Sequence, residues 1–177
     1  MVTTTLQLNR LDSRHHGVTR SIANVYAEAA SVCFDRHHSP PADVTIDGLN
    51  HRVSYSTVWT KPTPRELAAW ANSNDATEQA AYGVSLASIE TTEGLVAISR
   101  AETLTGADYY IAPIGSEVND LEGCFKLEVS GVDAGSMTDI RARVMRKKQQ
   151  ANSGTGNLPA IAAVVGFKEL IVVLERA

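Results

Sequence analysis

Residues 160–165 form an unbroken run of apolar side chains, and this run limits the folds open to the chain more than any other feature of the sequence. Such a run is typical of a β-strand that is buried on both faces of a sheet. The segment before it, residues 152–159, is rich in Ser, Gly and Asn, and residues 170–174 have the composition of one more strand. The sequence therefore predicts that the C-terminal part of the chain supplies buried strands.

The rest of the chain alternates between segments of helical and of strand character. Helices are predicted where apolar residues recur at helical spacing, and strands where β-formers lie between turn residues. The predicted helices span residues 18–34, 65–71, 75–89 and 136–150, and the predicted strands span residues 43–46, 52–59, 95–99, 106–112, 125–132, 160–165 and 170–174. We therefore expect one α/β (α+β) domain over residues 1–177, with a core in 75–177 and an added helix and β-hairpin in 1–74.

The composition also indicates one globular domain, because 44% of the 177 residues are hydrophobic and 20% are charged. A chain of this length and hydrophobic content can bury its own core. No apolar run approaches the roughly 20 residues that span a bilayer, and the polar opening lacks the apolar centre of a signal peptide. We therefore expect a cytoplasmic protein without a membrane partner. Cys33 and Cys124 lie in apolar neighbourhoods, which suits reduced thiols in a core.

The charge of the chain is unevenly distributed. A formal net charge of -4 argues against a protein that coats nucleic acid non-specifically, since that affinity comes mainly from Lys and Arg. Residues 141–148 are nevertheless strongly basic. A solvated helix face is the ordinary explanation of such a run. A contact with nucleic acid is the other explanation, and it depends on which residues lie nearby.

Two acidic residues stand out in the predicted strands. Along residues 125–131 apolar and polar side chains alternate, so that Lys126, Glu128 and Ser130 share one face. Asp108 opens another strand, where an acid is out of character. Two carboxylates on adjacent strands can hold a hard divalent cation such as Mg²⁺. The same alternation is expected of a half-solvated strand in which Lys126 and Glu128 are merely exposed.

The order of the elements and the positions of the acids resemble the PD-(D/E)xK (restriction-endonuclease-like) phosphodiesterase superfamily, over about residues 75–174. The core of that superfamily is helix, three strands, helix, strand. Its metal site uses an acid on the first helix, an Asp that opens the second strand and a Glu-x-Lys on the third, and the matching positions are Glu78, Asp108 and Glu128. The resemblance implies a nuclease that binds Mg²⁺ or Mn²⁺. The segments TGADYY and LEVSG also resemble small bacterial proteins of unknown function, which adds no activity.

The chain departs from the superfamily at the motif lysine, because Ser130 stands where the lysine is expected. A serine cannot supply the fixed positive charge that stabilises the charge developing on a phosphate. Lys126 shares the face of Glu128, and Lys147 or Lys148 lies close to the apolar stripe of the predicted helix at 136–150. Migration of the lysine onto this helix occurs in the superfamily. All three lysines are therefore candidates.

Glu78 has a second interpretation. Asp75 and Glu78 are spaced as a capping box, in which the glutamate accepts a hydrogen bond from the backbone at the start of the helix. The sequence favours neither role over the other.

Several functions fit these features. The first is a metal-dependent nuclease for DNA or RNA that uses Asp108, Glu128 and a lysine. The second is an inactive nuclease-like subunit that binds nucleic acid, a protein partner or a second copy of itself, as in a bacterial defence or repair complex. A structural partner that binds no nucleic acid is the third. A cavity where both acids meet a lysine ammonium would favour the nuclease, and an exposed Glu128 would exclude it.

Overall fold

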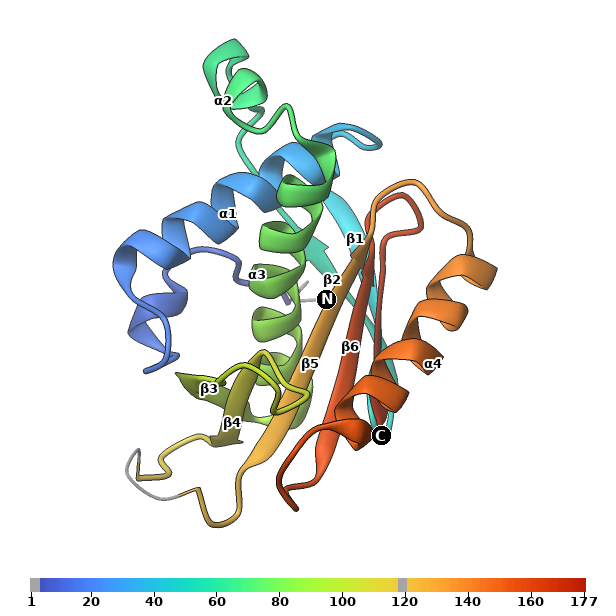
Figure 1. The fold of residues 1–177 in the computed structure, drawn as a ribbon. Coiled ribbons are helices and arrows are strands. Elements are labelled where there is room, and N and C mark those ends of the chain that lie inside the picture. Colours follow the sequence, from blue (N-terminus) through green and yellow to red (C-terminus); the bar gives the residue numbers. More distant parts are fainter. Residues whose placement is uncertain (1–3, 118–120) are drawn as a thin grey trace.

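The computed structural model describes residues 4–117 and 121–177, which form one seven-stranded sheet with helices on both faces (Figure 1). The strands are β1 (Ala42–Asp47), β2 (Arg52–Thr57), β3 (Leu95–Arg100), β4 (Tyr109–Pro113), β5 (Phe125–Val132), β6 (Ala160–Gly166) and β7 (Ile171–Arg176). The helices are α1 (Arg20–Asp35), α2 (Pro64–Ala69), α3 (Ser73–Glu93) and α4 (Met137–Ser153), and a short 3₁₀ turn, η1, spans Leu11–Ser13. Each helix and strand predicted from the sequence is present, so the mixed α/β class is confirmed.

The sheet mixes parallel and antiparallel pairs in the order β2-β1-β7-β6-β5-β4-β3. β5 runs parallel to β6, and β1 runs parallel to β7, whereas the other neighbours are antiparallel. The β1–β2 hairpin, expected as an addition to the core, therefore extends the same sheet, with Ile46 opposite Val172.

Helices cover the two faces unequally. α3 packs on one face and α1 packs on α3, while α4 lies alone against β5, β6 and β7 on the other face (Figure 1). Leu127 and Val129 of β5 point into the larger core under α3, and Ile140 and Val144 of α4 form a smaller core with neighbouring strands. β6 is buried along its whole length, as its apolar run predicts. The polar face of β5 therefore points toward α4.

Gly131 allows a close contact between β5 and α3. It lies inside β5, opposite Val165 of β6. A Cβ atom at this position would lie 2.6 Å from Thr77 Cγ2 and 2.8 Å from the Thr77 carbonyl oxygen. The missing side chain therefore lets α3 pack directly against the end of β5, and this close packing sets the distance between α3 and the sheet.

Among the residues that the structure describes, no helix combines the length and the apolar character that a membrane crossing requires. Cys33 and Cys124 are both buried, as their neighbourhoods predict.

Candidate active site

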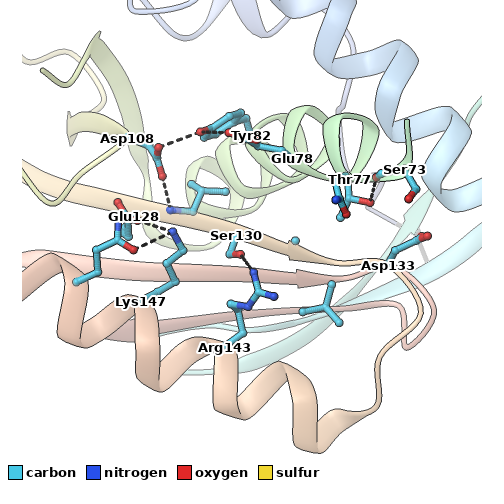
Figure 2. A pocket seen from close by; sticks show the side chains of 15 residues that line it. Ser73, Thr77, Glu78, Tyr82, Asp108, Glu128, Ser130, Asp133, Arg143 and Lys147 are labelled. Atoms are coloured by element: carbon cyan, nitrogen blue, oxygen red, sulfur yellow. Dashed lines mark hydrogen bonds and ion pairs between the residues drawn. The ribbon is translucent and has the colours of Figure 1, made fainter. Parts of the chain in front are cut away.

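A polar concavity opens where β4 and β5 separate. β4 pairs with β5 only as far as Leu127, so the following part of β5 has no β4 residue beside it. α3 from one face and α4 from the other both reach this opening, and with β5 they enclose a cavity of about 530 Å³ (Figure 2). The charged residues that line the cavity are Glu78, Asp108, Glu128, Asp133, Arg143 and Lys147.

Glu128 lies in this cavity and is not exposed, contrary to the half-solvated alternative. It is 2% exposed, and its Oε1 accepts a hydrogen bond of 2.6 Å from Lys147 Nζ on α4. Burial raises the pKa of Glu128, the hydrogen bond from Lys147 lowers it, and the nearby Asp108 carboxylate raises it; the net direction is upward. A buried acid of this kind is often part of a functional site.

Asp108 is fixed by two donors immediately before β4. Its Oδ2 accepts a hydrogen bond of 2.8 Å from the Val129 backbone N–H, and its Oδ1 accepts one of 2.9 Å from the Tyr82 hydroxyl. Burial, followed by the charge of Asp108, raises the pKa of Tyr82, so this hydroxyl keeps its hydrogen and remains a donor. The Arg100 guanidinium lies 4.4 Å from the centre of the Tyr82 ring and holds it in place.

The carboxyl groups of Asp108 and Glu128 are close enough to interact directly. The charge of Asp108 is one of the causes that raise the pKa of Glu128. Two neighbouring carboxylates repel each other, and positive charge between them relieves the repulsion. The pair therefore has a site for one positive charge, which a proton or a cation can fill.

Glu78 lines the same cavity and contacts Tyr82. Its Oε1 is 3.2 Å from the Tyr82 hydroxyl, whose one hydrogen has its shorter contact with Asp108. Glu78 does not cap α3, because that role belongs to Asn72, which accepts from the backbone N–H groups of Asn74 and Asp75. The capping-box interpretation is therefore wrong. No three His, Cys, Asp or Glu side chains in residues 4–117 and 121–177 are arranged to hold a metal ion, so the expected triad with Glu78 is not preformed.

The structure separates the three candidate lysines. Lys147 is the one that reaches the cavity, through its ion pair with Glu128. Lys148 points elsewhere and pairs with Glu175 of β7 at 3.0 Å. Lys126 is 3% exposed, and its Nζ donates to the Ala151 carbonyl at 2.7 Å rather than to an acid. Of the lysines that were candidates for the missing cation, only Lys147 has the required position.

Lys126 instead fastens the chain segment before Asp108 to the end of α4. Gly106, at φ +68, and Gly154 pack against each other so closely that a Cβ atom on Gly154 would collide with the Thr105 carbonyl. The Lys126 ammonium lies between the carbonyls of Thr105 and Ala151. These hydrogen bonds hold the segment that contains Asp108 next to α4, the helix that carries Lys147.

Two further residues of the cavity escaped the sequence analysis. Arg143 donates from Nη1 to Ser130 Oγ at 3.0 Å, so it brings a cation beside Ser130 (Figure 2). Its spacing from Ile140 gave a signal, since residues three apart share a helix face. Tyr82 follows Glu78 by one helical turn. Its contact with Asp108 could not be found from the sequence, because the two residues lie on separate segments, 26 positions apart.

The chain matches no protein family model, no curated protein and no solved structure. The chemistry of the cavity therefore has to be inferred from its own geometry.

Proposed function

We propose that the protein is a metal-dependent phosphodiesterase that hydrolyses DNA or RNA at Asp108 and Glu128. One observation carries this proposal: the buried Glu128 meets both a second carboxyl group and the Lys147 ammonium in one open polar cavity. Acids and a cation beside a cavity are the groups that phosphoryl transfer needs, because its transition state is stabilised mainly by position and charge.

The arrangement of the elements supports a restriction-endonuclease-like core. α3, β3, β4, β5, α4 and β6 follow one another as the resemblance implies, and helices lie on both faces of their sheet. Asp108 immediately precedes the second of these strands, and Glu128 lies on the third. Both acids therefore occupy the places that this proposal requires.

The donor atoms fit Mg²⁺ or Mn²⁺. Mg²⁺ is usually held by one or two carboxylates and keeps several waters, so two acids suffice without a third side chain. Val129 donates its N–H toward Asp108, and its carbonyl faces the same edge of β5 because both groups of a strand residue point to one side. Asp108, Glu128 and the Val129 carbonyl would hold the ion. When bound, it supplies positive charge beside the phosphate and makes water a stronger acid.

The side chains of the chain then have separate tasks. Val129 N–H and Tyr82 hold Asp108 in one orientation, and the burial of Glu128 keeps competing water from its carboxyl group. The Lys147 ammonium supplies a fixed positive charge next to Glu128 in place of the lysine missing at Ser130. This charge favours a phosphate that approaches the two acids.

A cleavage assay with matched variants tests the proposal. Single-stranded and double-stranded DNA and RNA are incubated with Mg²⁺, with Mn²⁺ and with EDTA, and Mn²⁺ binding is measured by titration calorimetry. Asp108→Asn and Glu128→Gln should each abolish cleavage and weaken Mn²⁺ binding, because each removes a ligand charge. The exposed acids Asp43 and Glu169 provide the controls Asp43→Asn and Glu169→Gln, which should behave as the parent.

A parent protein that cleaves no substrate with either metal would overturn the nuclease proposal. The inactive nuclease-like subunit, which binds nucleic acid or a partner protein in a defence or repair complex, would then take its place. The neutral side chain of Ser130 favours this second candidate, because the motif position itself carries no cation.

A further inference from the structure

Arg143 differs from Lys147, the other cation that lines the cavity, because no described residue of opposite charge pairs with it. Within the described part of the chain, its one hydrogen bond runs from Nη1 to the neutral Ser130 Oγ, at 3.0 Å. Its Nε is buried without a hydrogen-bond partner, and no described residue accepts from Nη2. Most of the five N–H donors of this guanidinium therefore have no acceptor among the described residues, and one of them, on Nε, is also shielded from solvent.

The acids of the cavity are all engaged by other groups. Glu128 pairs with Lys147, and Asp133 pairs with Arg36 at 3.2 Å and with His37 at 3.0 Å. These contacts leave neither acid as the counter-ion of Arg143. Glu78 and Asp108 both contact the Tyr82 hydroxyl.

We propose that Arg143 forms a phosphate-binding site distinct from the acid pair, and that it holds the neighbouring phosphate of the nucleic-acid strand. Arginine suits this task because its planar fork of donors matches two oxygens of one phosphate. The contact with Ser130 holds one arm of the fork and fixes the direction of the other. The identity of the ligand as a nucleic-acid strand rests on the proposed function.

The spacing along β5 supports the neighbouring phosphate as the ligand. Ser130 follows Glu128 by two residues on the same face of the strand, which corresponds to roughly 7 Å. Consecutive phosphates of an extended nucleic-acid strand have about the same separation. A strand with one phosphate at the acid pair can therefore place the next phosphate at Arg143.

Arg146 provides a matched control on the same helix. It carries the same charge three residues further along α4, but it is exposed and does not line the cavity. A general attraction of strands by the basic helix would depend on both arginines about equally. A built phosphate site would depend on Arg143 far more than on Arg146.

The test measures binding of a fluorescein-labelled single-stranded oligonucleotide by anisotropy in EDTA, where cleavage does not contribute. Arg143→Gln should weaken binding about tenfold or more, the usual effect of losing charged hydrogen bonds. It should also reduce the slope of log Kd against log salt by roughly 0.7, the share of one phosphate contact on a single strand. Arg146→Gln should change affinity by about twofold at most, because an exposed charge is screened. Arg143→Lys should recover part of the affinity, because it keeps the charge and loses the fork.

The outcomes separate this inference from the nuclease proposal. Equal losses in Arg143→Gln and Arg146→Gln, or a parent that binds no oligonucleotide, would overturn the phosphate site. A parent that binds through Arg143 but cleaves nothing with any metal would overturn the nuclease and leave the phosphate site intact. If Arg143→Gln unfolds, as thermal melting followed by circular dichroism would show, Arg143→Lys and Ser130→Ala carry the test. Both variants keep the positive charge, so an unchanged affinity in both would then overturn it.

Discussion

The Lys147 ammonium lies 2.6 Å from Glu128 Oε1 and joins α4 to the middle of the sheet. The lysine side chain is 19% exposed, whereas that of Glu128 is 3% exposed, so the pair has one buried partner and one that meets solvent. The cation can therefore face an incoming anion while it neutralises the acid behind it.

The first prediction compares the three lysines that the sequence proposed as the catalytic cation. Lys147→Met should lower the rate of the bound turnover step by roughly 10²-fold, as expected for one preorganised charge. Lys126→Met should leave that rate within a few-fold and destabilise the protein by about 1–3 kcal/mol, because the buried Ala151 carbonyl loses its donor. Single-turnover rates and urea unfolding measure the two effects. Lys148→Met is the control, and equal rates in all three variants would contradict the assignment of Lys147.

The second prediction concerns the pH dependence of stability through Glu128. Its pKa is raised in the folded state, so its contribution to stability is fully present below the ordinary value of 4.5 and is lost as pH rises through the folded pKa. Glutamine cannot ionise. Glu128→Gln should therefore gain stability relative to the parent as pH rises from about 4 to 8, as measured by urea unfolding at each pH. A difference that stays constant, or that falls with pH, would contradict this result.

The third prediction concerns Glu90, whose pKa shifts in the opposite direction. Burial raises the pKa of Glu90, but hydrogen bonds from His15 and Arg14 outweigh burial, and the net direction is downward. Its contribution is therefore present above the ordinary value of 4.5 and is lost as pH falls through the folded pKa. Glu90→Gln should cost about 1–2 kcal/mol near neutral pH, and the difference from the parent should shrink in acid. Urea unfolding at pH 7 and at about pH 3 would show this, and an undiminished difference in acid would refute it.

The fourth prediction tests the close packing of α3 on β5. Gly131→Ala should destabilise the protein by about 2–3 kcal/mol, because its Cβ would lie 2.6 Å from Thr77 Cγ2 and 2.8 Å from the Thr77 backbone oxygen. Thr77→Ala in the same chain should recover only part of the loss, since the contact with the backbone oxygen remains. Thermal unfolding compares the variants. Full recovery in the double variant would show that the side chain alone limits the approach of α3.

Local sequence patterns predicted most of the fold, because these elements follow from short-range physics. The apolar run of β6 and the alternation of β5 reflect where their side chains are buried, and both strands are present as expected. The sequence predicts Asp75 as the residue that caps the start of α3, whereas the structure has Asn72 in that position. Several neighbouring residues can cap a helix, and the sequence does not show which one adopts the required backbone conformation.

The candidate site was only partly predictable for a physical reason. Asp108 could be found because an acid is out of character at the start of a strand, and Glu128 because it shares the polar face of β5 with Lys126 and Ser130. The choice of Lys147 over Lys126 could not be predicted from the sequence, because it depends on how α4 crosses the sheet. Side chains on the same face of a strand can also end at different depths. The ammonium of Lys126 ends among backbone carbonyls, whereas Glu128, two residues along, reaches the cavity.

Arg143 and Lys147 are one helical turn apart on α4, so they form a single rigid pair of charges. The helix rests on the sheet through Ile140 and Val144, in a core separate from the one beneath α3. A Cβ atom on Gly166 of β6 would collide with Ile140, so α4 and β6 pack together with little free space between them. Any change in how α4 sits would move both charges in concert toward or away from the two acids. The charge that faces a substrate can thus be altered by substitutions beneath the helix, without any change to a residue that touches the substrate.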